Sequence, residues 1–440
     1  MIHVFKLGGR GVVMDVNSGA IHSADDIILD ILRDCNTLED LDKKTGPADA
    51  LDEIRQLAES GLLFADDPLA GVYRPKEPGV VKALCLHVAH DCNLRCGYCF
   101  AGGGEYGARG LMSLETGKAA IDFLLDSSGN RKHLEVDFFG GEPLMNFGAV
   151  KGITEYGNAQ AARRGKEIRF TLTTNGVLLD DEKTRFINNY MHNVVLSLDG
   201  RKEIHDRMRP DRAGAGSYDT VLGKFLKLVR ERGEKSYYVR GTFTRENLDF
   251  SEDVMHMGGL GFKHVSVEPV VADEDKAYAI RKEDLPRIFD EYEKLAGKLL
   301  AIRGTENDFD FFHFMIDLEG GPCAHKRASG CGAGGEYLAV APDGSLYPCH
   351  QFVGRDEFKM GDVASGVADT ARARQFCAAD VYTKEACRAC FAKFYCSGGC
   401  LANAYAANKD ILKPYEIGCE MQRKRTECAI MIKAAIEADD

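Results

Sequence analysis

Short apolar runs and segments of helical spacing alternate along residues 83–269. Six runs have the β-branched and aromatic content of strands. They are Ala83–Val88, Leu134–Phe138, Ile168–Thr173, Asn193–Ser197, Tyr237–Phe243 and His264–Pro269. Strands that alternate with helices usually pair in parallel, because each helix returns the chain to the same edge of the sheet. The pattern therefore predicts an α/β domain with a parallel sheet.

The first 64 residues have a different pattern. Three short strand-like runs, with turns at Gly8-Gly9 and Asn17-Ser18-Gly19, precede two helical segments, Asp25–Leu32 and Ala48–Glu59. Residues 65–80 hold three prolines and are predicted to form a linker. We expect residues 275–322 to be mainly a helical bridge to the last part of the chain.

Composition narrows the class of protein. The 440 residues carry a net charge of −12, which argues against a nucleic-acid partner. No apolar run reaches the ~18 residues of a membrane span, and residues 1–7 lack a signal-peptide pattern. We therefore expect a cytoplasmic protein without a membrane partner. The chain has fifteen cysteines, and because the cytoplasm is reducing, metal binding explains them better than disulfides.

Cys92, Cys96 and Cys99 form a C-x3-C-x2-C motif with Tyr98 before the third cysteine. Three thiolates on one loop can hold three irons of a [4Fe–4S] cube and leave the fourth iron open to a small molecule. Zinc sites instead pair two C-x2-C hooks. Gly140-Gly141-Glu142-Pro143 follows about 40 residues later, at the end of the second predicted strand. Together, the two motifs resemble those of radical S-adenosylmethionine (SAM) enzymes.

The resemblance implies a partial (β/α)6 barrel and SAM bound at the carboxyl ends of its strands. It also implies that Gly140, Gly141 and Glu142 bind the methionyl amino group and that Tyr98 lies near the adenine. Ser197, in Ser197-Leu198-Asp199-Gly200, would contact the ribose or the carboxylate. Arg240 would meet the carboxylate, or it forms a structural ion pair. The cofactor would supply a 5′-deoxyadenosyl radical, while the protein positions the reactants and excludes water.

Ten cysteines lie between Cys323 and Cys428. The spacing Cys331-x12-Gly344-x4-Cys349, followed by Cys387-x2-Cys390-x5-Cys396-x3-Cys400 and then Cys419, resembles the SPASM domain, which carries two auxiliary [4Fe–4S] clusters. The resemblance assigns Cys331, Cys349 and Cys400 to auxiliary cluster I. It assigns Cys387, Cys390, Cys396 and Cys419 to auxiliary cluster II. Cys323 either completes cluster I or leaves it with an open iron. We expect Cys35, Cys85, Cys377 and Cys428 to be buried apolar residues.

The front unit resembles the leader-peptide recognition element of ribosomal-peptide maturases, in which a leader adds a strand to a sheet edge beside a helix. It could also be a plain packing domain. Met1-Ile2-His3, Gly321-Pro322-Cys323 and Tyr347-Pro348-Cys349-His350 resemble the thioether-forming maturases of SCIFF peptides. That resemblance implies a cysteine-rich precursor peptide as substrate, and an external electron donor such as flavodoxin or ferredoxin.

Together, the patterns and resemblances predict an α/β fold in five parts. These are a winged-helix-like leader-recognition element (1–64), a linker (65–80), a radical SAM partial barrel (81–274), a helical bridge (275–322) and a SPASM domain (323–440). The predicted cofactors are SAM and three [4Fe–4S] clusters. The predicted activity is Cys-to-carbon thioether formation. The alternatives are an anaerobic sulfatase-maturing enzyme that forms formylglycine, for which the sequence shows no acidic proton acceptor, and a non-enzymatic zinc or iron–sulfur scaffold.

Overall fold

The computed structural model describes residues 1–318 and 324–439. The chain forms two compact units. Unit 1 comprises Met1–Pro75, Arg281–Gly330 and Ala379–Asp440, and unit 2 comprises Lys76–Ile280 and Cys331–Ala378. No helix in the described ranges is long and apolar enough to cross a membrane.

Unit 2 contains a parallel sheet built from the six predicted strands, in the order β10-β9-β8-β7-β6-β4. The strands are β4 (Ala83–His90), β6 (His133–Gly140), β7 (Glu167–Thr174), β8 (Asn193–Ser197), β9 (Tyr237–Phe243) and β10 (His264–Pro269). The short β5 (Gly110–Leu111) pairs antiparallel with β4. Helices connect the strands: α4 (Leu114–Ser127), α5 (Phe147–Arg163), α6 (Asp181–Tyr190), α7 (Lys202–Met208), α8 (Tyr218–Arg232) and α9 (Phe250–Gly259). The prediction of six parallel strands is confirmed.

The two faces of this sheet differ in burial. On β6 and β7 every second residue is buried, as with Phe138 and Phe170, whose rings stack at 5.6 Å. Helix α5 covers this face: a Cβ built on its Gly157 would lie 2.8 Å from the Phe170 ring. The residues between, such as Asp137 and Thr171, point to the other side and remain partly exposed. We refer to the side bearing Asp137, Phe139, Thr171 and Thr173 as the open face.

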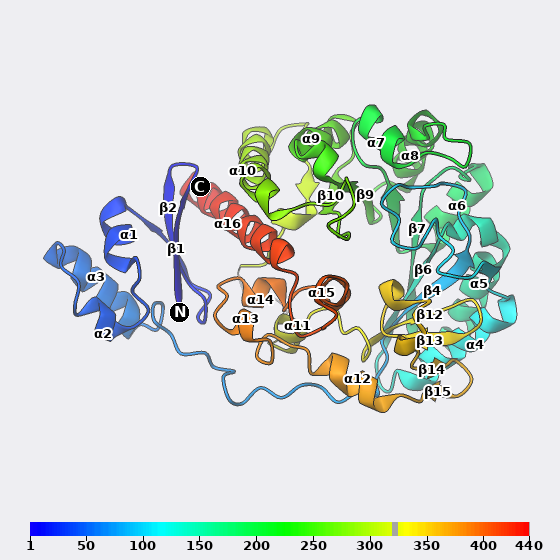
Figure 1. Ribbon diagram of the computed structural model, residues 1–440, viewed down its shortest axis with the longest axis horizontal. Coiled ribbons are helices and arrows are strands. Elements are labelled where there is room, and N and C mark those ends of the chain that lie inside the picture. The colour runs from blue at the N-terminus through cyan, green and yellow to red at the C-terminus, as the bar shows by residue number, and fades with distance from the viewer. Residues whose placement is uncertain (319–323, 440) are drawn as a thin grey trace. The chain divides into compact units, whose positions relative to one another are not determined.

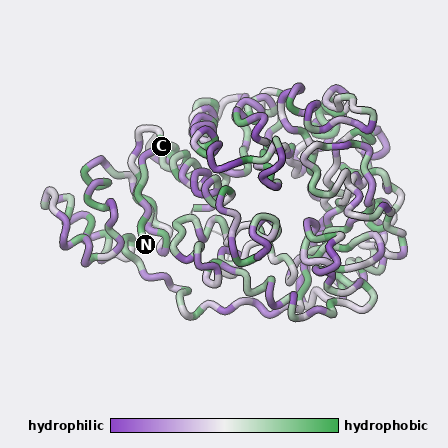
Figure 2. Tube along the Cα trace, viewed as in Figure 1, coloured by the Kyte–Doolittle hydropathy of each residue, from purple (hydrophilic) through white to green (hydrophobic). Residues whose placement is uncertain are grey.

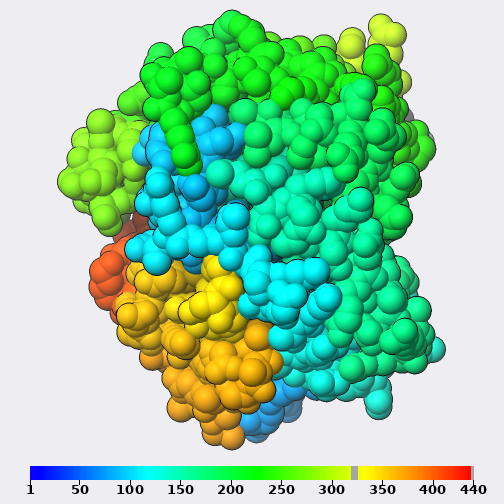
Figure 3. Space-filling model, turned by 90° about the vertical axis from the view of Figure 1, so that its right-hand side faces the viewer, coloured from blue at the N-terminus to red at the C-terminus, as the bar shows by residue number. Residues whose placement is uncertain are grey.

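The sheet extends beyond the six strands. β12 (Tyr337–Val340) pairs in parallel with β4, and an antiparallel meander follows: β13 (Ser345–Tyr347), β14 (Gly361–Asp362) and β15 (Gly366–Val367). Helix α12 (Thr370–Cys377) ends this segment. In Figure 3 these residues, in yellow and orange, border the cyan region that contains α4, and a Cβ on Gly344 would lie 3.6 Å from Thr116 of that helix. The first part of the cysteine-rich region thus shares one sheet with β4, the strand that leads into the cysteine loop.

Unit 1 contains the front sheet β1 (Ile2–Leu7), β2 (Arg10–Asp15) and β3 (Ile21–Ala24), antiparallel in that order. The helices after it are α1 (Asp26–Leu32), α2 (Leu38–Leu41) and α3 (Ala48–Glu59). The remaining elements are α10 (Leu285–Ile302), β11 (Asp310–Phe311), α11 (Ala324–Ser329), α13 (Glu385–Arg388), α14 (Lys393–Cys396), α15 (Leu401–Asn408) and α16 (Glu416–Asp439). Figure 1 shows α16 alongside β1 and β2, and α3 on the far side of that sheet.

Alternation along β2 gives the front sheet two buried faces. Val13 packs with Leu29, Leu41 and Ile54 of the three helices. Val12 and Met14 point the other way, into a core formed with Cys387, Phe391 and Phe394 and with Ile430 of α16. Figure 2 shows green segments along the β1–β2 hairpin, and of its two strands β2 is the one that is buried on both faces. The front sheet is therefore part of the core that supports the segment bearing the last cysteines.

Candidate functional site

The cysteine loop begins directly after β4 and is fixed by backbone hydrogen bonds to the end of α7 and the residues that follow it. Gly97 N donates to Met208 O (2.8 Å), and Arg95 N donates to Pro210 O (2.8 Å). Cys92 Sγ accepts from Leu94 N (3.4 Å) and from Asn175 Nδ2 (3.6 Å). Burial raises the pKa of Cys92 to about 12, and the nearby Cys96 and Cys99 add to the rise. All three predicted cluster thiols thus lie on this one loop, where their charges affect one another.

Gly140 and Gly141 bring the end of β6 against the cysteine loop. Gly141 N donates to Ala89 O (2.8 Å), and Glu142 N donates to Asp91 O (2.9 Å). A Cβ on Gly141 would lie 2.1 Å from Asp91 O, and one on Gly140, whose φ is +124°, would lie 2.3 Å from Ala89 O. Only glycine permits this approach. The two motifs that the sequence analysis linked thus meet in the structure, although the predicted contact with SAM stays a prediction.

Glu142 is 1% exposed and holds the ends of two strands together. Its carboxylate accepts from Thr174 Oγ1 (2.8 Å), Asn175 N (2.8 Å) and Leu144 N (3.0 Å). Burial raises the pKa of Glu142 to about 7, and these three donors oppose the rise. A cationic group beside Glu142 would favour its ionised form, which suits the ammonium predicted to bind here.

Tyr98 is held by Asp199, a residue that the sequence analysis did not assign a role. The Tyr98 hydroxyl donates to Asp199 Oδ2 (2.6 Å), and Arg209 Nε donates to the same oxygen (2.9 Å). The Arg209 guanidinium also lies 5.5 Å from the centre of the Tyr98 ring. Asp199 is fully buried, so this ion pair fixes Tyr98 and the loop around it.

Two further residues anchor the loop. Arg212 Nε donates to Cys92 O (2.9 Å), and its Nη2 pairs with Asp91. Asn175 Nδ2 donates to Asn93 Oδ1 (2.8 Å). The other polar atom of that side chain, the buried Asn93 Nδ2, has no protein partner among the described residues. The basic run Arg207–Arg212 after the fourth strand was the signal in the sequence for Arg209 and Arg212.

Ser197 and Arg240 lie opposite each other on β8 and β9. Arg240 is exposed, and its Nη2 lies 3.7 Å from the Glu268 carboxylate on β10. The structural ion pair considered for Arg240 is therefore present. The predicted contacts of both residues with SAM stay predictions.

Gly141→Ala tests whether the contact between the two motifs is needed. The added Cβ would push the Asp91 backbone away, and because a displacement of ~1 Å can cost ~100-fold in rate, we expect reductive SAM cleavage to fall by about that factor. Gly148→Ala is the matched control, since a Cβ there meets nothing within 4 Å. The rate of 5′-deoxyadenosine formation measures the effect. Equal rates in the two variants would show that the close contact between the two motifs is not needed.

The four cysteines assigned to auxiliary cluster II all belong to unit 1 and lie near one another. Cys387, Cys390 and Cys396 each raise the pKa of Cys419, which burial raises to about 12, and Cys390 and Cys396 likewise raise the pKa of Cys387. The buried Lys384 donates to Gly398 O (2.6 Å), and its charge lowers the pKa values of Cys387 and Cys396. Arg423 donates to Cys390. These cations would offset the negative charge of a cluster bound by four thiolates.

Auxiliary cluster I stays a prediction. Cys331, which is exposed, and Cys349, which is buried, belong to unit 2, whereas the exposed Cys400 belongs to unit 1. Cys323 lies outside the described residues. Of the four cysteines expected to be buried, Cys35, Cys85 and Cys428 are, and Cys377 is only partly so.

The predicted cluster ligands are all cysteines, the usual ligands of iron–sulfur clusters. Within the described ranges, no group of three or more Cys, His, Asp or Glu side chains surrounds one point closely enough for a lone metal ion. A cube spreads its thiolates over separate irons, so its ligands stand further apart. The raised thiol pKa values describe protonated cysteines, which iron would deprotonate on binding. The unpartnered Asn93 Nδ2 beside Cys92 provides a donor for a ligand at the first cluster.

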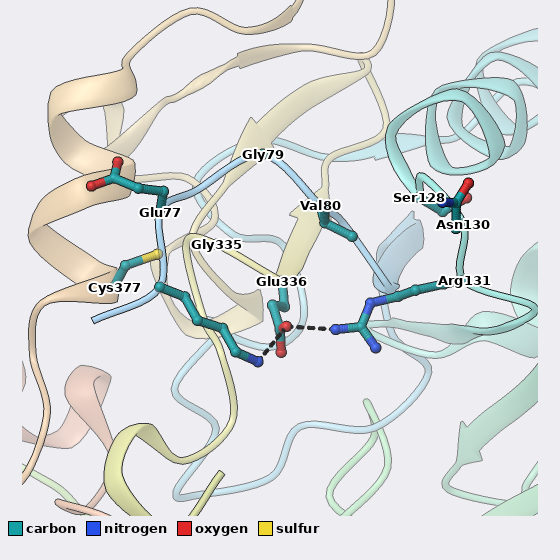
Figure 4. Close-up of a pocket in the computed structure, with 10 residues that line it drawn as sticks. Glu77, Gly79, Val80, Ser128, Asn130, Arg131, Gly335, Glu336 and Cys377 are labelled. Atoms are coloured by element: carbon teal, nitrogen blue, oxygen red, sulfur yellow. Dashed lines mark hydrogen bonds and ion pairs between the residues drawn. The ribbon is translucent and has the colours of Figure 1, made fainter. Parts of the chain in front are cut away.

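A separate cavity of about 530 Å³ lies in unit 2, and Figure 4 shows its lining. Glu336 accepts there from Lys76 (2.8 Å) and Arg131 (2.8 Å), with the sulfur of Cys377 in the wall. Each cation has a carboxylate partner, and no predicted site residue lines the cavity. We assign it no function.

Two family models match the chain: the radical SAM superfamily over residues 86–251, and the SPASM iron–sulfur cluster-binding domain over residues 331–391. A relative from Methanocaldococcus jannaschii, an uncharacterised protein, is 30% identical over 50% of this chain and 71% of its own length. The chain belongs to the radical SAM superfamily. It therefore uses SAM and iron–sulfur clusters, as the sequence motifs predicted.

Two relatives of known role are more distant. The subtilosin biosynthesis protein AlbA of Bacillus subtilis is 26% identical over 63% of this chain and 56% of its own length. The cysteine-type anaerobic sulfatase-maturating enzyme of Clostridium perfringens is 25% identical over 73% and 88%.

Solved structures show the same fold. Native anSMEcpe with bound AdoMet matches with a TM-score of 0.69 and 20% identity, covering 81% of this chain and all of that chain. Streptococcus suis SuiB bound to the precursor peptide SuiA matches with a TM-score of 0.54 and 16% identity, covering 93% of this chain and 96% of that one.

Proposed function

We propose that this chain is a peptide maturase that forms thioether cross-links between cysteine sulfur and carbon in a cysteine-rich precursor. The relatives support a peptide substrate, since AlbA is named for bacteriocin biosynthesis and SuiB was solved with a precursor peptide. When bound, SAM and the reduced cluster supply a carbon-centred radical that removes a hydrogen atom from the peptide.

The chain's own residues have three tasks in this proposal. Cys92, Cys96 and Cys99 hold the SAM-binding cluster, and the Asp199–Arg209 pair fixes Tyr98 beside it. Glu142 and Asn93 offer an acceptor and a donor to the methionyl end of SAM. Auxiliary cluster II would bind Cys387, Cys390, Cys396 and Cys419, and cluster I would bind Cys331, Cys349 and Cys400 with or without Cys323, which makes three clusters in all.

The front sheet is the reason that we favour a leader-dependent maturase over a sulfatase-type enzyme. A match that spans all of anSMEcpe leaves about a fifth of this chain without a counterpart, whereas the SuiB match spans nearly the whole chain. Edge strand β1 and helix α1 border a cavity of about 320 Å³ between Val4 and Leu29, with Lys6 paired to Asp26 (2.6 Å). An edge strand beside a helix suits a leader peptide that adds a strand.

Mass spectrometry of the processed precursor tests the proposal. Each thioether should lower the peptide mass by two hydrogens and consume one SAM. The cross-linked sulfurs should resist alkylation even after reduction, because thioethers do not exchange with thiols. A core peptide without its leader should be processed far more slowly.

The second candidate, formylglycine formation, rests on the sulfatase-maturating relative. It predicts an aldehyde-bearing product whose remaining cysteines are all alkylated. That product would replace the thioether proposal. A protein that binds zinc instead of iron would point to the non-enzymatic scaffold.

A further inference from the structure

An acidic side chain in unit 2 faces the side of the sheet that helices leave open. Asp137 lies on β6, opposite Cys85 of β4 and Thr171 of β7. It stands three residues before Gly140, so it lies ~10 Å below the glycine turn that meets the cysteine loop. Residues between these two levels, such as Phe139, also point to this face and are partly exposed.

Asp137 has a hydrogen-bond donor but no cationic partner. The Thr171 hydroxyl donates to its carboxylate, and among the described residues no basic side chain contributes to its pKa. Burial, followed by the charge of Glu135, raises the pKa of Asp137 to about 7. A partly buried acid whose pKa is raised and which no base neutralises is typical of reactive sites.

The other groups around Asp137 form a connected set. Tyr337 of β12 donates to the Cys85 thiol, and its hydroxyl lies 3.4 Å from His350 Nδ1. The His350 ring lies 5.1 Å from that of Phe139 and 5.9 Å from that of Phe100, the residue after Cys99. Side chains at this level therefore connect the region of Asp137 with the cysteine loop.

We propose that Asp137 is the catalytic proton acceptor for the substrate cysteine, an inference that rests on the proposed thioether function. In each cross-link a peptide C–H hydrogen atom leaves to the SAM-derived radical, and the S–H bond of the substrate cysteine loses its proton to the Asp137 carboxylate. Sulfur would bond to the carbon, and the one remaining electron would need an acceptor, which an auxiliary iron–sulfur cluster would supply when bound. The sequence analysis identified no acidic acceptor, a group that the formylglycine-forming alternative would also need.

The proposal predicts how the rate depends on pH. A base acts when it is ionised, so the cross-linking rate should rise with pH through about 7 and then level off. The titratable or charged groups that point to the same face near Asp137 are Cys85 and His87 of β4, Glu135 of β6, Arg169 of β7 and Tyr337 of β12. His350 lies beside Tyr337, and burial lowers its pKa to about 4, so it is neutral near pH 7. Burial keeps Cys85 and Tyr337 protonated and His87 neutral across this range, since it raises the first two pKa values and lowers the third.

Asp137→Asn removes the base and keeps the shape. The substrate thiol must then ionise by itself, and with a thiol pKa of ~8.5 only ~3% is thiolate at pH 7, so the rate there should fall about thirtyfold. The rise with pH should shift from about 7 to about 8.5, while reductive SAM cleavage stays unchanged. Glu135→Gln, two residues away on the same face, is the matched control: it removes a charge that raises the pKa of Asp137, so the rise should move below pH 7 and not toward 8.5.

Asp137→Glu retains a carboxyl group and should restore most of the rate at pH 7; it also serves if the Asn variant does not fold. Cross-linking by the Asn variant at the wild-type rate, with the rise still near pH 7, would overturn the role of Asp137. Loss of the low-pH rate in Asp137→Glu as severe as in Asp137→Asn, with SAM cleavage intact, would also overturn it. A wild-type protein that forms no thioether at any pH would instead refute the proposed function.

Discussion

Replacing Cys92, Cys96 and Cys99 together by Ala should remove about four of about twelve bound irons and abolish SAM cleavage. The structure gives the reason, since these thiols form one group after β4, with Asn175 and Arg212 holding Cys92 from two sides. No other cysteine loop in the described part of unit 2 could take over the cluster, because Cys331 and Cys349 are separated by a hairpin. Iron analysis after anaerobic reconstitution and assay of 5′-deoxyadenosine measure the two effects.

The control is the double variant Cys35→Ala with Cys428→Ala. Both residues are buried, at 1% and 0% exposure, and neither belongs to a predicted ligand set. This variant should bind the full complement of iron and cleave SAM at the normal rate. Survival of SAM cleavage in the triple variant would contradict the assignment of the first cluster.

The sequence predicted the bounds of an element correctly where those bounds depend on the local pattern alone. Strands such as β8, β9 and β10 have the predicted bounds, since each is a short apolar run between helical segments. The glycines of Gly140-Gly141 were identified from their motif, although the reason for them is the approach of the Asp91 backbone, which no local pattern contains.

The sequence did not predict features that depend on contacts between residues far apart in the chain. Asp199 was visible only as part of a strand end, but its role depends on Tyr98, a hundred residues earlier. Asp137 is one acid in an alternating strand, and its distinction comes from neighbours on β4 and β7. The extension of the sheet by β12 likewise depends on pairing with a strand some 250 residues earlier.

The front sheet packs against the segment that bears the last cysteines, which is the packing role that the sequence analysis kept as an alternative. One pair of variants separates this role from the proposed leader binding. Val12 and Val13 are adjacent on β2, identical in kind and at most 1% exposed, but they point to opposite faces. Val12 packs in the core that contains Cys387, Phe391 and Phe394, whereas Val13 packs against the helices α1 to α3. Removing residues 1–64 would remove both contacts at once, so truncation is a poor test of leader recognition.

Val12→Ala should loosen auxiliary cluster II. Losing two buried methyl groups costs about 2 kcal/mol, which makes local opening of the Cys387–Cys396 segment about thirtyfold more frequent. Iron of that cluster should then be lost faster to a chelator, and the loss can be followed by electron paramagnetic resonance. Val13→Ala should cost a similar amount of stability in the helical half, without accelerating iron loss. Equal rates of iron loss in the two variants would show that the front sheet does not support the cluster, and the sheet would then be free to serve the leader alone.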